Sequence, residues 1–114
     1  MAENQPVIES YHAHIYFDES LREDAQAVRD EVNQKFSVEM GRWHEKSIGP
    51  HPRWSYQIAF APEVFDQLTP WLMLNRRGCT VFLHPNTGQG LEDHRDRAVW
   101  MGKQVELNLK IFMD

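Results

Sequence analysis

The chain has 114 residues with 17 acidic and 12 basic side chains, which gives a formal net charge of −5. This length predicts one domain, and a 41% hydrophobic content argues against a disordered chain. The acidic balance argues against a nucleic-acid partner, and the lack of an apolar run near ~18 residues argues against a membrane-spanning helix. Cys79 stands alone and residues 1–6 lack an apolar stretch, so we expect a cytoplasmic protein without disulfides.

Two elements are predicted in the first third of the chain, after a tail over residues 1–10. Residues 11–17 (YHAHIYF) alternate along their length and are rich in aromatic side chains, which predicts a strand. Ser20 and Glu23 match the capping box, in which the two side chains satisfy backbone amides at a helix start. Apolar residues recur at helical spacing from residue 21 to residue 36, so we expect a helix of about four turns.

The middle of the chain predicts two further strands and a second helix. Residues 36–44 predict a strand, and residues 45–52 (EKSIGPHP) a loop, because glycine and proline interrupt regular structure. Residues 54–60 alternate large apolar side chains with small or polar ones, which predicts a third strand. A helix is expected over residues 62–74, where Pro70 fits a restart of the helix.

The last third predicts a fourth strand over residues 80–83, a loop over 86–90, a short helix over 92–100 and a final strand over 105–112. Two successive β-α-β units with an extension from residue 86 predict one α+β, ferredoxin-like split βαβ domain over residues 1–114. Its antiparallel sheet would carry both helices on one face. The other face would be open to a partner subunit or an active site.

Six histidines are the most unusual feature of the composition, because His is the common acid–base group and metal ligand near neutral pH. Alternate side chains of a strand share a face, so His12 and His14 are expected on the open face together with His84 of the fourth strand. Tyr16 and Phe82 would share this face and could line an apolar pocket for an aromatic ring.

The expected topology brings four imidazoles to one end of the sheet. We place the first strand between the third and the fourth, parallel to the third and antiparallel to the fourth. Its start would then lie near His84, which ends the fourth strand, and near His51, which precedes the third. Neutral imidazole binds Fe, Zn, Cu or Ni, so His12, His14 and His84 form the predicted pool of metal ligands.

Other polar residues allow a functional and a structural interpretation. His94 could move a proton, or it could belong to a solvated stretch of charged residues. Arg53 could hold a substrate carboxylate, and the backbone at Thr87 could bind an anion; surface solvation and a tight turn are the alternatives. A metal site without a carboxylate, formed by His alone, is also open. The candidates for a carboxylate ligand, none of them fixed by spacing, are Glu45, Asp93 and Glu106.

Five motifs in order resemble the DOPA 4,5-dioxygenase family. They are YHAHIYFD from residue 11, GPHP from residue 49, WLMLNR from residue 71, HPNTG from residue 84, and DH at residues 93–94 followed by Ala98, Trp100 and Gly102. The resemblance covers residues 11–102. It implies a small ferredoxin-like domain, often a homodimer, that cleaves catechols beside their hydroxyl groups (extradiol cleavage) with Fe(II) and O2.

The resemblance implies functional interest in His12, His14, His51, His84 and His94, each of which stands in a matching motif. Within it, His12, His14 and His84 are expected to supply the ligands of a non-haem iron, which zinc could replace in a purified sample. His51 and His94 are the candidates for moving protons. The predicted substrate contacts are Tyr16, Phe82, Arg53, Thr87 and Asp93.

Two other functions stay open on the sequence alone. The first is a cofactor-free oxygenase or proton-transfer enzyme with His as base, and the second is a non-enzymatic module that binds a metal or a small aromatic ligand. Metal content separates the dioxygenase from the first alternative, and turnover separates both enzymes from the second. A homodimer is expected because an open sheet face would expose Tyr16 and Phe82.

Overall fold

A five-stranded antiparallel sheet with the strand order β2-β3-β1-β4-β5 forms the centre of the fold. The computed structural model describes residues 5–113. The three long strands are β1 (Ser10–Phe17), β3 (Trp54–Phe60) and β4 (Thr80–Asn86), with β1 in the middle. The two edge strands are short, β2 (Glu39–Met40) and β5 (Val99–Met101).

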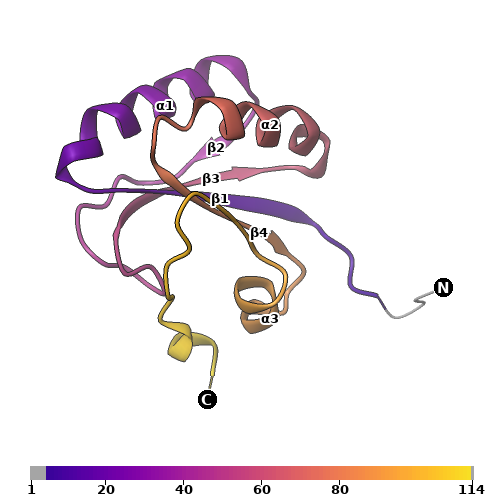
Figure 1. Cartoon of the computed structure of the whole chain (residues 1–114). Coiled ribbons are helices and arrows are strands. Elements are labelled where there is room, and N and C mark those ends of the chain that lie inside the picture. Colours follow the sequence, from indigo (N-terminus) through magenta and orange to yellow (C-terminus); the bar gives the residue numbers. More distant parts are fainter. Residues whose placement is uncertain (1–4, 114) are drawn as a thin grey trace.

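Two helices, α1 (Arg22–Lys35) and α2 (Phe65–Asn75), cover one face of the sheet (Figure 1). Each follows a single turn of 3-10 helix, over Glu19–Leu21 and Pro62–Val64. None of the helices within residues 5–113 is long and apolar enough to cross a lipid bilayer. Apolar side chains between sheet and helices form one core, whose buried members are Ala13, Ile15, Phe17, Ala25, Val28, Val32, Tyr56, Ile58, Phe60, Leu68, Leu72, Cys79, Val81, Leu83 and Met101.

The expected α+β, ferredoxin-like arrangement is confirmed, but the predicted direction of one strand pair is wrong. β1 runs antiparallel to β3, with Tyr11 opposite Phe60 and Phe17 opposite Trp54. The reason lies in the connections. The crossover through α1 returns β2 in the direction of β1, and β3 then reverses against β2. The start of β1 therefore lies beside the end of β3.

The predicted helix over residues 92–100 is also wrong in its second half. The helix α3 spans Gly90–Arg95, and the chain then returns to the sheet as β5, where Val99 pairs with Leu83. The predicted second strand is likewise reduced to the two residues of β2.

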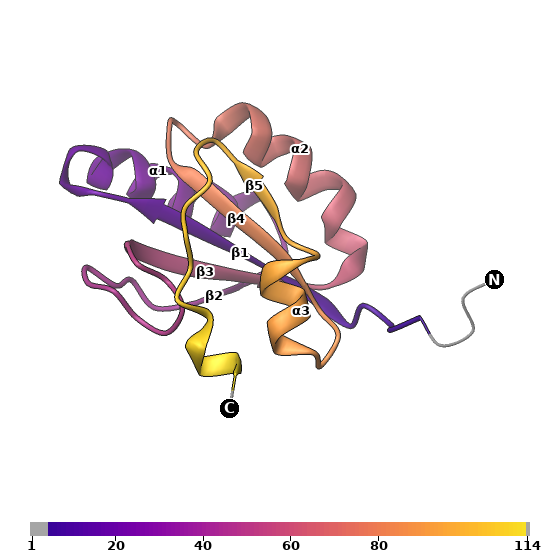
Figure 2. The same ribbon diagram turned by 60° about the horizontal axis from the view of Figure 1, so that its bottom comes forward.

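Residues 105–112 do not form the predicted final strand. The segment 102–113, here called the C-terminal strap, crosses the sheet face opposite α1 and α2 and ends in a 3-10 turn, Leu109–Phe112 (Figure 2). Val105, Leu107 and Leu109 are half-buried, and the residues between them are exposed. The alternation of the sequence therefore reports an extended chain with one buried side, and not a hydrogen-bonded strand.

The sheet face opposite the helices, here called the histidine face, is covered by the chain itself. The strap and α3 lie over it (Figure 2). Phe82 is completely buried and Tyr16 is 3% exposed. A homodimer is expected from the exposure of these two rings, but both are buried within a single chain. The homodimer remains a prediction that rests on the resemblance alone.

Candidate metal and acid–base site

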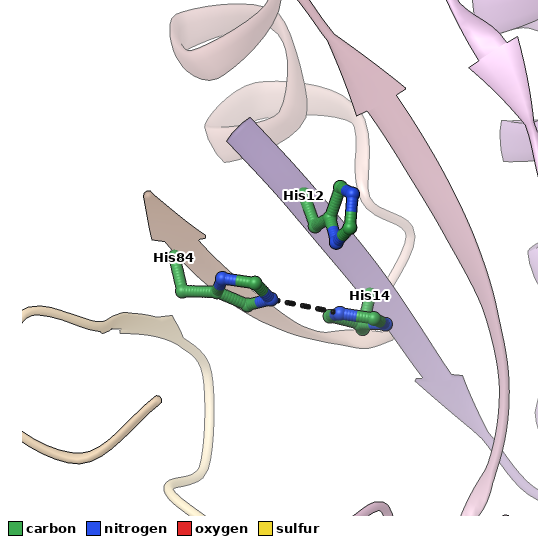
Figure 3. A group of neighbouring side chains, drawn as sticks. All are labelled: His12, His14 and His84. Atoms are coloured by element: carbon green, nitrogen blue, oxygen red, sulfur yellow. Dashed lines mark hydrogen bonds between the residues drawn. The ribbon is translucent and has the colours of Figure 1, made fainter. Parts of the chain in front are cut away.

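Three imidazoles from adjacent strands converge on the histidine face. His12 and His14 come from β1, and His84 comes from β4, where it lies opposite His12 in the register. Their possible ligand atoms all lie within 4.8 Å of one another (Figure 3). The Nε2 atoms of His14 and His84 are 3.2 Å apart. Two nitrogens bound to one ion at about 2.1 Å, with the bonds near a right angle, are about 3 Å apart. The pair therefore fits a shared metal ion.

A main-chain carbonyl fixes the ring of His84. Its Nδ1 lies 2.9 Å from the carbonyl oxygen of Pro85, which can only accept a hydrogen bond. Nδ1 therefore carries the proton, and the lone pair of Nε2 is directed toward His14. An outer hydrogen bond of this kind orients most metal-binding histidines.

Burial keeps the imidazoles of this face neutral. It is the largest cause of a lowered pKa in His12, His14, His51, His84 and His94, and repulsion between the rings adds to it in the first four. The pKa falls to about 4 in His51 and to about 3 in His84, although the bond to Pro85 acts in the opposite direction in His84. Metal binding requires neutral imidazole, so these rings need not lose a proton first.

His51 reaches this cluster from a turn. The backbones of Ile48 and His51 pair with each other at 3.0 and 3.2 Å, and Gly49 between them takes a φ of +57°. This turn folds over β1, so that the rings of His51 and His14 are 4.1 Å apart. The predicted position of His51 near the ligand group is correct, although the parallel pairing from which it followed is wrong.

A buried tyrosine holds the ring of His51. The hydroxyl of Tyr16 lies 2.6 Å from Nδ1 of His51. Burial raises the pKa of Tyr16, so the hydroxyl keeps its proton and donates it to Nδ1. The neutral ring of His51 then carries its own proton on Nε2. Tyr16 was predicted to line a pocket, and its observed partner is His51.

His94 lies on the other side of the cluster, on α3. Its ring stands between those of His84 and Phe112, with centroids 4.0 and 4.3 Å away. Its Nδ1 is 2.7 Å from the carbonyl oxygen of Gly90 and therefore donates a proton there. The lone pair of its Nε2 is left available. His94 and His51 thus adjoin different members of the ligand group and hold opposite protonation patterns.

Phe82 forms the apolar base of the cluster. Its ring centroid is 5.4 Å from that of His84, 5.7 Å from His14 and 5.9 Å from His94. Trp100 of β5 also packs against Phe82, at a ring-centroid distance of 4.6 Å. These rings limit the access of water to the imidazoles and lower the local dielectric constant.

The structure gives Thr87 and Asp93 other partners than the imidazoles. The Asp93 carboxylate accepts hydrogen bonds from the Thr87 amide at 2.8 Å, the Thr87 hydroxyl at 2.9 Å and Arg97 at 3.0 Å. Burial acts to raise the pKa of Asp93, but these hydrogen bonds outweigh it and the pKa is lowered. The network ties the loop after β4 to α3. A contact of either residue with substrate remains a prediction.

Arg53 is exposed and lines a separate cavity of about 210 Å³ beside Tyr16, Thr80 and Val105. It is not one of the residues that surround the three imidazoles. Its predicted contact with substrate therefore has no support from the geometry and remains a prediction.

Within residues 5–113, the group of three candidate ligands contains no carboxylate. Glu45 instead accepts hydrogen bonds from Arg22 at 2.7 Å and from the Trp43 indole at 2.8 Å. Asp93 is held by Arg97, and Glu106 is exposed on the strap. The geometry favours the ligand set composed of histidine alone.

A cavity of about 280 Å³ adjoins His14 and His51, and the sequence did not point to it. Arg42, His44 and Gln57 line it as well. His44 joins this group because its backbone pairs with Ser55. The one available signal was the alternation of β3, which places Ser55 and Gln57 on the histidine face.

Comparisons with known proteins show which family the chain resembles. The model of the Dopa 4,5-dioxygenase family matches residues 11–111. A DOPA 4,5-dioxygenase from Amanita muscaria is 33% identical over 111 residues, covering 90% of this chain and 49% of that protein. An uncharacterized 21.2 kDa protein from Botryotinia fuckeliana is 34% identical over 114 residues, covering 90% of this chain and 62% of its own length.

A solved structure shares the fold as well. The crystal structure of a candidate dioxygenase from Nostoc punctiforme superposes with a TM-score of 0.89 and 46% sequence identity, covering 90% of each chain. This chain spans about half to three fifths of the two curated relatives. The family match over nearly the whole chain, together with this structural similarity, shows that the chain belongs to the Dopa 4,5-dioxygenase family.

Proposed function

We propose that this protein is a non-haem iron-dependent extradiol dioxygenase that cleaves a catechol with O2. The observation that carries the proposal is the convergence of His12, His14 and His84, whose possible ligand atoms lie within 4.8 Å of one another. Family membership supports an oxygenase. Bound Fe(II) would supply the coordination positions at which a catechol and O2 come together.

The charge of the site supports a catechol as the substrate. Neutral imidazoles leave both positive charges of a divalent ion uncompensated in a largely buried cluster, because no carboxylate joins the ligand group within residues 5–113. Uncompensated charge is costly in such surroundings. A catechol that has lost its protons supplies two adjacent negative oxygens. The relative from Amanita muscaria is named for DOPA, which is a catechol.

His51 and His94, whose rings contact the candidate ligands, are suited to opposite steps of proton transfer. His94 donates through Nδ1 to Gly90, so its Nε2 can accept a proton from a catechol hydroxyl. His51 accepts from Tyr16 at Nδ1 and carries its own proton on Nε2, so it can pass that proton to the product as the Tyr16 hydroxyl gives its proton to Nδ1. Both pKa values are lowered, mainly by burial, and the two rings therefore start neutral.

Anaerobic reconstitution with Fe(II), followed by a catechol and air, tests the function. L-DOPA, caffeate and protocatechuate are compared by visible absorbance. We expect a yellow ring-opened product that requires both iron and O2, and mass spectrometry of that product shows which ring bond is cleaved. Bound iron with no product from any catechol would contradict the substrate class, and failure to bind iron would contradict the metal site.

A matched pair of variants connects the product to the proposed ligands. His12→Ala is expected to lose iron and product together. His44→Ala removes an imidazole that lies outside the ligand group, so its iron content is expected to match that of the unmodified protein.

A further inference from the structure

We propose that the C-terminal strap positions both of the histidines assigned to proton transfer. The strap contacts the surroundings of His94 through Phe112 and those of His51 through Asn108. The inference rests on the proposed function for the roles of these two rings, but the contacts themselves do not depend on it. Phe112 and Asn108 are positioning residues, because they act through other side chains.

Phe112 closes one face of the His94 ring. The Phe112 ring is 4.3 Å away at 31°, and the His84 ring is 4.0 Å away at 36°. Both rings are tilted against that of His94, and each lies in contact with it. His94 therefore contacts both a candidate metal ligand and the strap. With Nδ1 bound to Gly90, the ring cannot rotate without losing these contacts.

Gly90 makes room for this arrangement. A Cβ added there would lie 2.8 Å from Cδ1 and 3.1 Å from Cε1 of Phe112, which is closer than side chains pack. Gly90 begins α3 and does not take a positive φ, so its backbone does not require glycine. Glycine is required here because the Phe112 ring occupies the space that a Cβ would need. The residue whose carbonyl holds His94 is also the residue that admits the strap.

A second contact anchors the turn that carries His51. The backbone amide of Asn108 donates to the carbonyl oxygen of Pro50 at 2.9 Å. Pro50 is buried, whereas Ile48 and Gly49 in the same turn are exposed. The strap therefore holds the turn at its buried corner, one residue from His51.

The start of the strap explains why it leaves the sheet. Gly102 follows β5 with a φ of +87°, which other residues rarely adopt. A Cβ there would also lie 2.9 Å from a guanidinium nitrogen of Arg76, which donates to the Cys79 carbonyl. The chain turns at this point from the sheet edge onto the histidine face (Figure 2). Val105, Leu107 and Leu109 of the strap are half-buried.

A double-mutant cycle tests the contact with His94. Phe112→Ala removes the ring, and Gly90→Ala displaces it. We expect each to lower kcat about tenfold, with KM changed less than twofold and iron binding retained. The double variant should be no worse than either single one, because the added Cβ then fills vacated space. Phe112→Tyr keeps the ring and should restore kcat, and Ile111→Ala, on the exposed side of the same turn, should leave it unchanged.

A pair of substitutions at one position tests the contact with the turn of His51. Asn108→Pro removes the amide donor, and the φ of −87° at this residue has the sign that proline requires and differs from its usual value by about 20°. Asn108→Ala keeps the amide and loses only the side-chain bond to the Lys110 amide. We expect kcat to fall about fivefold in the proline variant and to stay within twofold in the alanine variant.

Nitrogen-15 spectra of the histidine rings in the metal-free protein provide a readout that needs no turnover. We expect Phe112→Ala to shift the His94 signals and Asn108→Pro to shift those of His51. Unchanged ring signals together with unchanged kcat would overturn the role of the strap. Shifted signals in a protein that turns over no catechol would support the strap and contradict the proposed function.

Discussion

The hydroxyl of Tyr16 donates to Nδ1 of His51 at 2.6 Å and so joins the central strand to a turn 35 residues further along the chain. Burial excludes water from both groups, and Tyr16 keeps its proton because its pKa is raised. This hydrogen bond determines that the neutral His51 ring carries its proton on Nε2 and not on Nδ1. A residue of the sheet thus determines the chemistry of a residue in a turn.

Tyr16→Phe tests this relationship. Without the hydroxyl, the His51 proton can move to Nδ1, so we expect kcat to fall about tenfold, a fraction of the usual effect of a general acid. Stability should fall by about 1 kcal/mol, as for one buried hydrogen bond. Tyr56→Phe is the matched control, since its hydroxyl donates to Ala25 at 2.7 Å on the helix side of the sheet. It should lose similar stability and keep kcat. Equal kcat losses in the two variants would contradict a specific role for Tyr16.

Removal of a candidate metal ligand is expected to separate metal binding from folding. His84→Ala leaves two imidazoles of the group and should weaken Fe(II) affinity more than about 100-fold. Loss of a residue that only hydrogen-bonds to a metal ligand already weakens metal affinity about 10–100-fold. Circular dichroism should remain unchanged, since the β4 backbone pairs on both sides. Isothermal titration with Fe(II) under anaerobic conditions measures the effect. Affinity equal to that of the unmodified protein would exclude His84 from the ligand set.

Side-chain alternation predicted which histidines meet, because it depends only on the local chain. His12 and His14 are two residues apart on one strand and therefore share a face, whatever the direction of the neighbouring strands. His84 joined them through the expected neighbour relation of the first and fourth strands, which is confirmed. Local alternation and this one neighbour relation between strands thus sufficed for the ligand group.

The parts that depend on long-range geometry could not be read in the same way. The direction of β3 relative to β1 follows from the connection through β2, whose two residues carry almost no pattern. The alternation from Val105 onward correctly predicts which residues are half-buried, but it does not predict hydrogen bonding. An extended strap and a β-strand both bury alternate residues. The contact of Phe112 with His94 joins two segments that no spacing relates.

The metal-free protein is expected to lose stability in mild acid. The folded pKa of each clustered histidine lies below its usual value of 6.5, so the unfolded chain takes up protons first as the pH falls. Stability is therefore complete above pH 6.5 and declines below it, toward about pH 4 for His51 and about pH 3 for His84. The slope from His51 and from His84 approaches about 1.4 kcal/mol per pH unit where the pH lies well below 6.5 and above the folded pKa.

Urea unfolding at pH 7, 6 and 5 measures this slope. The window lies above the range in which the carboxylates titrate, so the histidines dominate it. His51→Gln removes one titrating group and should reduce the mean slope between pH 7 and pH 5 by about 1 kcal/mol per pH unit, because the unfolded histidine is only half protonated at pH 6.5. A free energy of unfolding that is constant from pH 7 to pH 5 would show that the rings are not held neutral by the fold.

Asp93→Asn distinguishes the structural network of Asp93 from its predicted contact with substrate. Asp93 is 2% exposed and its carboxylate accepts from Thr87 and Arg97, so its neutralisation is expected to cost about 2 kcal/mol, as for hydrogen bonds to a charged group. Asp96→Asn is the matched control, because Asp96 forms an exposed pair with Arg95 that is worth less than about 1 kcal/mol. Thermal unfolding measures both.

Steady-state kinetics with the best catechol then decides the role of Asp93. If the carboxylate only ties α3 to the loop after β4, the variant should lower kcat through displacement of the adjacent His94 and leave KM within about twofold, because no contact with substrate is lost. A KM raised tenfold or more at unchanged kcat would instead establish Asp93 as a substrate contact. The lost interaction would then be one that the bound substrate and the transition state make equally.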